Sequence, residues 1–225
     1  MKHALNCLVC AVILAAGCSS APVITGAESE AEKLYRTGAA YLDQGDYEDA
    51  QEQFLKVISD YSYSKWEPFA RIGLADTHFM REEFAAAFEI YKLFLQMRPN
   101  HELADRAAFQ MGNCTFEQRP SDFWILPPAE EKDLSDSVEK AAEQYREYLR
   151  LYPQGKFVKE AQDKLAEAET MLLSRELAVA EFYAKKDRCP AVKMRLKYIT
   201  DHYTVTSEEM RGRIQELSKQ CPGSE

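Results

Sequence analysis

The cysteines of this 225-residue chain are the side chains whose spacing first suggests chemistry. Cys7 and Cys10 have the C-x-x-C spacing that favours redox or zinc chemistry in a folded domain. They lie, however, in an N-terminal segment, residues 1–17, that begins with the basic Lys2 and continues with an uncharged apolar run. That run is too short to span a membrane, which needs about 20 residues, and is typical of a signal peptide. We therefore expect this cysteine pair to be removed with the leader.

Cys18 ends the segment LAAGC, residues 14–18, in which small residues lead to Gly-Cys. This segment resembles the lipobox of bacterial lipoproteins, although Ala15 stands where Leu is more usual. The resemblance implies that the Cys18 thiol is diacylated, that the leader is cut before it, and that the new N-terminus is acylated. These three acyl chains are more than the two membrane-binding signals that stable anchoring needs. Ser19 and Ser20 stand where inner-membrane lipoproteins usually carry Asp, which implies the outer membrane. The alternative is an ordinary secretory signal with an incidental cysteine.

Three further cysteines lie in the body of the chain. Cys114 falls on an expected helix, where a buried small apolar role suits it. Cys189 precedes an expected helix at about 190–202, and Cys221 follows the next one, at about 206–219. Two antiparallel helices joined by a short turn bring both cysteines to the same end. A disulfide between them would therefore staple the last hairpin in an oxidising compartment.

Neither the histidines nor the paired acids form a catalytic or metal-binding pattern. His78, His101 and His202 have no second ligand at metal spacing, and His78 occupies a repeat position where packing is favoured. The acidic pairs stand at expected helix starts or in a loop, where they suit the helix dipole better than acid–base chemistry; these pairs are Glu82–Glu83, Glu130–Glu131 and Glu208–Glu209. No GxSxG, P-loop or HExxH motif is present. We expect a non-enzymatic protein without metal or cofactor.

The elements that must position these residues are helices. In the segment AAFEIYKLFLQMRPN, residues 86–100, Ala87, Tyr91 and Phe94 are spaced i, i+4, i+7 and share one helical face, and Pro99 ends the helix. Strand signals are nearly absent. The same register of one small residue, two large residues and a terminating position recurs at Ala50, Phe54, Val57 and Ser62, at Ala141, Tyr145, Tyr148 and Pro153, and at Val192, Leu196, Ile199 and Thr204.

Each copy has a partner helix upstream that carries a small residue where the paired helices would touch: Gly38, Ala75, Gly112 and Ala180. This pattern resembles the tetratricopeptide repeat of about 34 residues. The resemblance implies an all-α solenoid of about ten helices, or about five repeats, with a core that continues between neighbours. The expected helices are at about 29–43, 46–61, 65–81, 84–97, 101–119, 136–152, 157–173, 174–186, 190–202 and 206–219. Asp136 with Glu139, and Thr206 with Glu209, read as capping boxes.

An insertion at residues 119–136 interrupts the third repeat. It contains three prolines and a tryptophan and cannot be one helix. Its FWIL cluster either belongs to a plain surface insertion or contacts a partner. The expected division of the chain is a leader (1–17), a lipidated tether (18–28), N-terminal repeats (29–155), C-terminal repeats (156–221) and a tail (222–225).

Charge is distributed unevenly along a chain whose formal net charge is −9. Residues 18–175 contain 18 basic and 29 acidic residues. Residues 176–225 contain 9 basic and 8 acidic residues. Six of those bases fall within residues 185–197. The acidic balance excludes a nucleic-acid-binding protein. The basic patch favours docking to an acidic partner or to anionic headgroups, with a solvated helical face as the alternative.

In tetratricopeptide arrays the first helix of each pair lines the concave face. An aromatic groove with a few polar groups suits an extended or aromatic-ended peptide, and some of its residues are expected to be core between repeats. The groove residues expected here are Tyr35, Leu42, Phe69, Ile72, Asp76, Phe79, Phe109, Asn113 and Phe116.

The lipobox, the acidic repeat array, the insertion and the final hairpin together resemble the BamD family, the lipoprotein component of the outer-membrane β-barrel assembly (BAM) machinery. The segments that carry the resemblance are YEDAQEQFLKVISDY (47–61), FLQMRPNH (94–101) and YREYLRLYPQG (145–155). The resemblance implies a lipid-anchored scaffold on the periplasmic face of the outer membrane that helps to deliver and insert β-barrel proteins. Its C-terminal repeats would dock on the POTRA domains of BamA, and its N-terminal repeats would receive unfolded barrel precursors and, in some bacteria, other BAM lipoproteins such as BamC.

The family resemblance also implies where BamA binds. Related proteins place an Arg for this contact in the first helix of the last hairpin, and Arg195 matches it, with Lys193 and Lys197 beside it. Because Arg195 precedes the core position Leu196, we expect it to be exposed. Thr204 departs from the Pro that the family often has.

Two other classes of protein remain open at this point. A pilotin-type repeat lipoprotein that escorts a secretin would share the lipobox and the repeats but would not need the basic hairpin. A lipid-anchored enzyme of envelope metabolism would need an acid or nucleophile in the groove, and the sequence offers none.

Overall fold

The computed structural model describes residues 26–120 and 134–222. Within these ranges the chain forms nine α-helices and one π-helical turn, without a strand. In chain order these are α1 (Gly26–Gln44), α2 (Tyr47–Asp60), α3 (Glu67–Met80), α4 (Phe84–Met97), α5 (Ala104–Glu117), the π-helical turn η2 (Ser135–Glu139), α6 (Lys140–Leu151), α7 (Val158–Ala184), α8 (Cys189–His202) and α9 (Glu208–Gln220).

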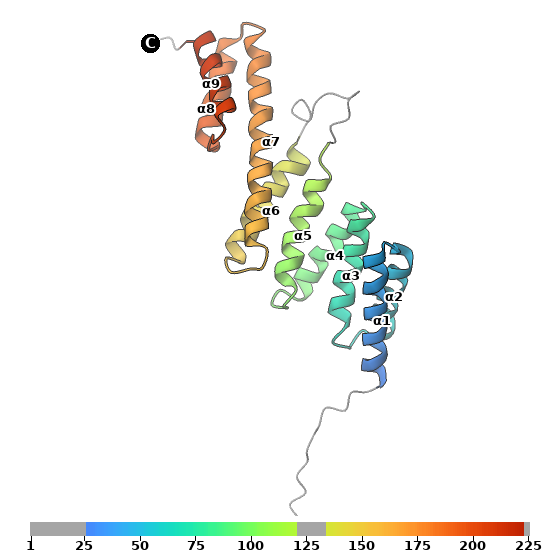
Figure 1. Cartoon of the computed structure of the whole chain (residues 1–225). Coiled ribbons are helices and arrows are strands. Elements are labelled where there is room, and N and C mark those ends of the chain that lie inside the picture. The colour runs from blue at the N-terminus through green and yellow to red at the C-terminus, as the bar shows by residue number, and fades with distance from the viewer. Residues whose placement is uncertain (1–25, 121–133, 223–225) are drawn as a thin grey trace, which may run out of the picture.

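Consecutive helices pack against one another from α1 to α8, and α9 packs on both α7 and α8. Figure 1 shows the resulting array, which runs from α1 and α2 at one end to α8 and α9 at the other. The core follows the array as four successive apolar clusters rather than one central cluster. The all-α repeat architecture predicted from the sequence is therefore confirmed.

The small and large positions of the repeat register form this core. Ala87, Tyr91 and Phe94 are each 0% exposed, as are the matching Ala50 and Val57. The predicted small residues Gly38, Ala75, Gly112 and Ala180 are all buried. At Gly112 an added Cβ would lie 2.6 Å from the ring of Tyr145, so only glycine lets α5 approach α6 this closely. In the last copy Val192 and Ile199 are buried, whereas Leu196 is half-buried.

Three helix pairs are joined by turns with one residue in the left-handed region. Gly45 follows α1 with φ 83°, a conformation that glycine adopts without a steric cost. Glu82 after α3 and Asp187 after α7 adopt φ 61° and 55° at the corresponding places. These two residues have a Cβ and therefore pay a steric cost that glycine avoids.

One predicted helix boundary is wrong. Two helices were expected at 157–173 and 174–186, but α7 is a single 27-residue helix. No Gly or Pro interrupts residues 158–184, so the backbone has no reason to break there. Leu172 belongs to the cluster with α6, and Leu173 belongs to the cluster with α8 and α9, so adjacent residues carry the helix from one cluster to the next.

Neither predicted capping box forms, and the two helices begin in other ways. The N-cap of α9 is Ser207, whose hydroxyl oxygen accepts a hydrogen bond from the backbone N–H of Met210 at 3.5 Å. Before α6, the turn η2 has no side-chain cap, and Asp136 instead pairs with Lys140 at 2.6 Å. Residues 134 and 138, both apolar and almost fully buried, fix the position of this turn.

Candidate partner-binding surfaces

Half-buried aromatic side chains from α1 and α3 meet on one face of the array. The ring of Tyr35 stacks on Trp66 at 5.1 Å between centroids, and Phe69 meets Tyr35 edge-on at 6.0 Å. The guanidinium of Arg36 lies 5.9 Å from the Trp66 ring. The indole Nε1 of Trp66 is buried, and it has no hydrogen-bond acceptor among the described residues. These four side chains, which we call the aromatic surface, offer flat apolar area, and the Lys65 ammonium also lies 5.3 Å from the Trp66 ring.

Asp76 lies on α3 next to this surface and ties three helices together. Its carboxylate accepts hydrogen bonds from the Tyr91 hydroxyl on α4 and from the Arg106 guanidinium on α5, the latter at 2.6 Å. Burial raises the pKa of Asp76, while the charge of Arg106 and the Tyr91 hydrogen bond act in the opposite direction. Burial also raises the pKa of Tyr91. With its side chain only 12% exposed, Asp76 orders the groove wall more than it offers a contact.

Three predicted groove residues are core instead. Ile72, Phe109 and Phe116 are 2%, 8% and 0% exposed, so they cannot meet a peptide. Ile72 belongs to the cluster around α4, and Phe109 stacks on Phe157 at 5.1 Å.

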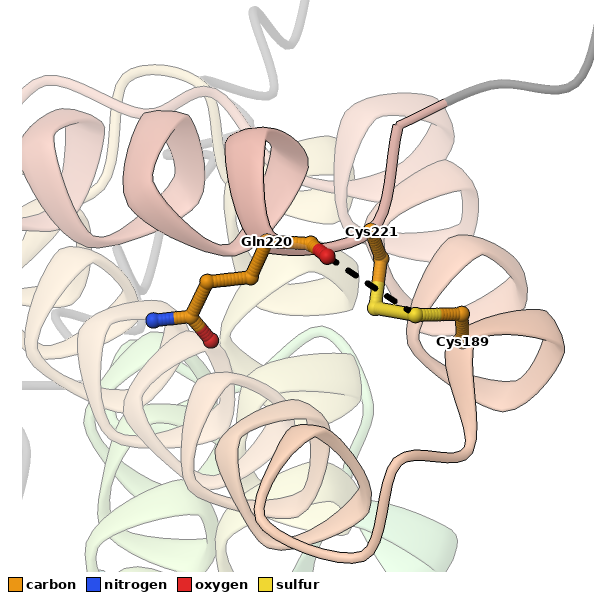
Figure 2. Close-up of a disulfide and its surroundings, with 3 residues drawn as sticks. All are labelled: Cys189, Gln220 and Cys221. Carbon is orange, nitrogen blue, oxygen red and sulfur yellow. Dashed lines mark hydrogen bonds between the residues drawn. A yellow bond between two sulfur atoms is a disulfide. The ribbon is translucent and has the colours of Figure 1, made fainter.

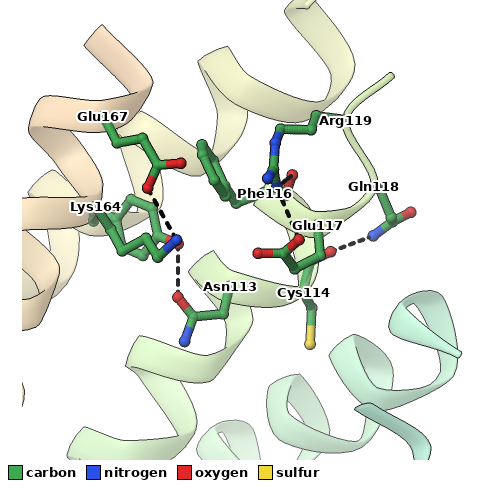
Figure 3. A network of polar contacts seen from close by, with 9 residues as sticks. Asn113, Cys114, Phe116, Glu117, Gln118, Arg119, Lys164 and Glu167 are labelled. Atoms are coloured by element: carbon green, nitrogen blue, oxygen red, sulfur yellow. Dashed lines mark hydrogen bonds and ion pairs between the residues drawn. The ribbon is translucent and has the colours of Figure 1, made fainter. Parts of the chain in front are cut away.

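The burial of Phe116 has a specific cause. Its ring lies between the guanidinium of Arg119, at 4.2 Å, and the ammonium of Lys164, at 4.8 Å (Figure 3). Each of these cations is paired with a carboxylate, Arg119 with Glu117 and Lys164 with Glu167. A side chain of α7 thus contacts the end of α5.

The other predicted groove residues are half-buried, and each has contacts within the array. Tyr35 and Phe69 are in contact, as described above. Leu42 packs into the cluster around α2, and Phe79 packs against Phe84 at 5.2 Å. Asn113 accepts a hydrogen bond from the Tyr145 hydroxyl at 2.7 Å. Of the predicted groove residues, Tyr35 and Phe69 are the two that contact each other in the aromatic surface.

Arg195 on α8 is not freely exposed, contrary to the prediction. Its guanidinium lies 2.7 Å from a carboxylate oxygen of Glu176 on α7. The Glu176 side chain is 8% exposed and also pairs with Arg175 at 3.3 Å. A buried carboxylate needs such a partner, so it draws Arg195 back against α7.

The exposed face of α8 is formed by other residues. Met194 and Tyr198, one turn apart, are 67% and 37% exposed. Lys197 is exposed and pairs with Asp201 within the helix, and Lys193 is half-buried. Tyr198 stacks on His202 with ring centroids 4.1 Å apart. This α8 face, Lys193 to His202, combines an apolar centre with lysines at its edge.

A disulfide joins Cys189, at the start of α8, to Cys221, after the end of α9 (Figure 2). The two Cα atoms are 5.2 Å apart across a sequence separation of 32. The Sγ of Cys189 also lies 3.9 Å from the carbonyl oxygen of Gln220, and because a half-cystine has no thiol proton this is a packing contact. Cys114 is a buried free thiol whose pKa burial raises to about 12.

Several residues of these surfaces were missed in the sequence. Trp66 lies at the start of the helix expected at 65–81, outside the repeat register, so the repeat pattern gave no signal for it. The sequence did contain a signal for Glu176. At helical spacing it shares a face with Leu173, Leu177 and Ala180, and that face is buried in the structure. An acid on such a face requires a cation, and Arg195 and Arg175 both pair with it.

The leader, Cys18 and the FWIL cluster lie outside the described residues. Within the part of the chain that is described, no helix is both long and apolar enough to cross a membrane. No group of three or more His, Cys, Asp or Glu side chains in that part could hold a metal ion.

Fold and surfaces together define a helical-repeat protein of the tetratricopeptide type with two separate candidate contact faces. Residues 27–217 match the family described as YfiO, outer membrane lipoprotein, and the chain belongs to that family.

Several relatives carry the name outer membrane protein assembly factor BamD, and three of them show the range of similarity. The Caulobacter vibrioides protein is 26% identical over 192 residues, which cover 85% of this chain and 60% of the relative. The Vibrio cholerae protein is 22% identical over 92% of this chain and 86% of its own length. For the Rickettsia prowazekii protein the identity is 20%, over 90% of this chain and 77% of the relative. The chain thus spans less than two thirds of the Caulobacter relative.

Proposed function

We propose that this chain is an outer membrane protein assembly factor, a non-enzymatic scaffold held at the periplasmic face of the outer membrane by acylated Cys18. The family match over residues 27–217 carries this proposal. Relatives in several bacteria with the name of assembly factor support it. A repeat array suits the role because its extended surface can hold more than one partner at once.

The α8 face is the proposed docking site for the POTRA domains of the barrel subunit, BamA. Met194 and Tyr198 supply an apolar centre, and Lys193 and Lys197 supply charge at the edge. An apolar centre with a polar rim is the usual anatomy of a protein interface. Because Arg195 is engaged by Glu176, its proposed role is to hold α8 in place rather than to meet the partner.

The aromatic surface is the proposed site for unfolded β-barrel precursors. Tyr35, Trp66 and Phe69 present flat apolar area to an extended chain, and the cations of Arg36 and Lys65 lie beside the Trp66 ring. The two surfaces are formed by different helices, α1 and α3 for the precursor and α8 for the barrel subunit. The array can therefore engage both at once, together with other lipoproteins of the same machinery.

A detergent pull-down tests the proposed function. The double variant Met194→Ala/Lys197→Glu changes only the α8 face, and Lys219→Glu on α9 is the matched control for charge reversal at an exposed lysine. We expect the parent and the control to recover a POTRA-bearing barrel protein from outer membranes in near-stoichiometric amount, and the double variant to recover several-fold less. Recovery of a secretin instead would favour the pilotin class, and equal recovery by all three proteins would reject the α8 face as the docking site.

A further inference from the structure

The turns after α2, α4 and α6 lie at the end of the array where α1 begins. Consecutive helices pack side by side and are joined by short turns, so each helix runs back along the one before it (Figure 1). The turns at this end are residues 61–66, 98–103 and 152–157. The first of them touches α1, because the Trp66 ring stacks on Tyr35. We call this end of the N-terminal repeats the entry end.

Contacts between neighbouring repeats place the three turns next to one another. The ring of His101, in the second turn, lies edge-on to Phe69, three residues after the first turn, with centroids 5.7 Å apart. The backbone N–H of Lys156, in the third turn, donates a hydrogen bond to the Asp105 carboxylate near the start of α5 at 3.1 Å. The three turns therefore form one border of the array, which begins beside α1.

An exposed apolar side chain stands in or directly before each of these turns. Tyr63 in the first turn is 101% exposed. Met97 and Leu151, the last residues of α4 and α6, are 55% and 50% exposed. Lys65 and Lys156 are exposed in the first and third turns. A tyrosine ring suits the boundary between lipid headgroups and acyl chains, and a lysine near it can keep its ammonium in water.

Side-chain type alone does not separate this end from the opposite one. The three turns contain three basic residues and one acid, but Arg98 is engaged by the buried Glu67 at 2.7 Å. Exposed apolar side chains also occur near the opposite ends of α3 and α7, at Met80 and Phe182. What distinguishes the entry end is its distance from the proposed lipid anchor.

The chain between Cys18 and Gly26 is short enough to hold the entry end close to a bilayer. Eight residues separate the proposed acylation site from the start of α1, and they span at most about 29 Å when fully extended. As a flexible chain they span about 16 Å on average. Helix α1 itself, with 19 residues, is about 29 Å long, so the opposite ends of the first repeats lie that much further away. The tether therefore gives the entry end the higher effective concentration at the bilayer surface.

We infer that the entry end lies against the bilayer that holds the anchor, with Tyr63, Met97 and Leu151 at the boundary between headgroups and acyl chains. The inference rests on the proposed acylation of Cys18 and adds a fixed orientation to it. Because Trp66 of the aromatic surface belongs to the first of these turns, a precursor bound there is held beside the membrane that it is to enter.

Lipid-attached quenchers test this orientation on the acylated full-length protein in phosphatidylcholine–phosphatidylglycerol vesicles. The fluorophore NBD is attached in turn to Tyr63→Cys, Met97→Cys and Leu151→Cys, and to Met80→Cys and Phe182→Cys as controls from exposed apolar positions at the opposite end. We expect a doxyl group near the headgroup to quench the three entry-end labels at least about twofold more than the two control labels. Aqueous iodide should show the reverse preference.

A second variant tests whether apolar contact holds this orientation. Tyr63→Asp places a charge at the lipid boundary and should lower the lipid quenching of a label at position 97 about twofold or more. Met80→Asp makes the matching change at the opposite end and should leave that quenching unchanged. Equal effects of the two substitutions would overturn the inference, because the entry end would then contribute nothing specific.

Vesicle flotation separates failure of the anchor from failure of the orientation. A protein that floats with the vesicles but shows equal lipid quenching at all five positions keeps the anchor and overturns the orientation. A protein that does not float overturns both. If the entry-end labels are shielded from iodide only after a POTRA-bearing barrel protein is added, and the lipid quencher has no effect on them, the entry end belongs to a protein partner and the inference is overturned.

Discussion

The guanidinium of Arg195 lies 2.7 Å from a carboxylate oxygen of Glu176, across the interface between α8 and α7. A charged residue in the last hairpin therefore has an internal partner before any other protein arrives. Since the Glu176 side chain is only 8% exposed, this pair contributes to the position of α8 on the array. Loss of partner binding after mutation of Arg195 would thus reflect a displaced helix as readily as a lost contact.

We predict that Arg195→Met destabilises the protein, because it leaves the Glu176 carboxylate with Arg175 as its remaining cation. The expected loss in the free energy of unfolding is about 1–3 kcal/mol, below the range for a fully buried pair because Arg195 is partly exposed. Urea unfolding measures it. In the double variant Arg195→Met/Glu176→Gln, part of the loss should be recovered because no buried charge remains. Strictly additive effects of the two substitutions would contradict the coupling.

The tight approach of α5 to α6 gives a second prediction. An added Cβ at Gly112 would lie 2.6 Å from the Tyr145 ring, which is fully buried and cannot move aside. Gly112→Ala is therefore expected to lower the free energy of unfolding by about 1–3 kcal/mol through overpacking. Differential scanning calorimetry would show it as a lower Tm.

A glycine in open space is the control for this substitution. Nothing lies within 4 Å of a Cβ built at Gly212 on α9. Gly212→Ala should therefore raise stability by about 0.5–1 kcal/mol through helix propensity alone. If both alanine variants shifted Tm in the same direction, close packing would not be the reason for the glycine at position 112.

Much of this fold could be predicted from the spacing of small and large residues. The register of Ala87, Tyr91 and Phe94 is a local signal, and its repetition fixes which helices pair. The repeat pattern predicted a break within α7 because it describes pairs of short helices, whereas α7 is continuous. The absence of Gly and Pro from residues 158–184 was the local signal for a single helix. Glu82 and Asp187 adopt the same left-handed conformation as Gly45. Because neither residue is glycine, the sequence gave no signal of a turn at these two positions.

The candidate surfaces were less predictable than the fold. Helical periodicity shows that Ile72, Phe109 and Phe116 share a side of their helices, but not whether a neighbouring helix covers that side. Phe116 is covered by Lys164, which is 48 positions away in the chain and whose position follows only from the packed structure. For the same reason, whether Arg195 is exposed depended on Glu176, a residue on another helix.

The pKa of Asp76 leads to a prediction about pH. Because burial raises this pKa, the folded protein holds the carboxyl proton more tightly than the unfolded chain does. The resulting stabilisation is fully present below the unfolded pKa of about 3.9 and is lost as the pH rises through the folded pKa. Asp76→Asn removes this titration and keeps an oxygen that accepts from Tyr91. We expect the variant's stability relative to the parent to rise as the pH increases above about 4.

Glu83 provides the opposite case for the same urea titrations. The hydrogen bond with His78 lowers the pKa of Glu83, so its stabilisation is present above the unfolded pKa of about 4.3 and is lost as the pH falls through the folded pKa. Glu83→Gln should therefore differ from the parent mainly at neutral pH, and the difference should shrink in acid. A stability difference for Asp76→Asn that does not change with pH would contradict the assigned shift.

The disulfide between Cys189 and Cys221 is expected to hold α9 rather than the whole array. Only Leu217 and Cys221 are buried in this last segment, so apolar contacts alone attach it weakly. Closing a loop over a sequence separation of 32 stabilises the folded state by about 3–4 kcal/mol in the chain-entropy model.

Reduction, or Cys189→Ser/Cys221→Ser, should therefore speed amide hydrogen exchange in α9 while α3 to α5 stay protected. The free thiol Cys114 lies in that protected region, so Cys114→Ser should leave exchange in α9 unchanged. Uniform acceleration of exchange across the chain would instead make the disulfide a global element of stability.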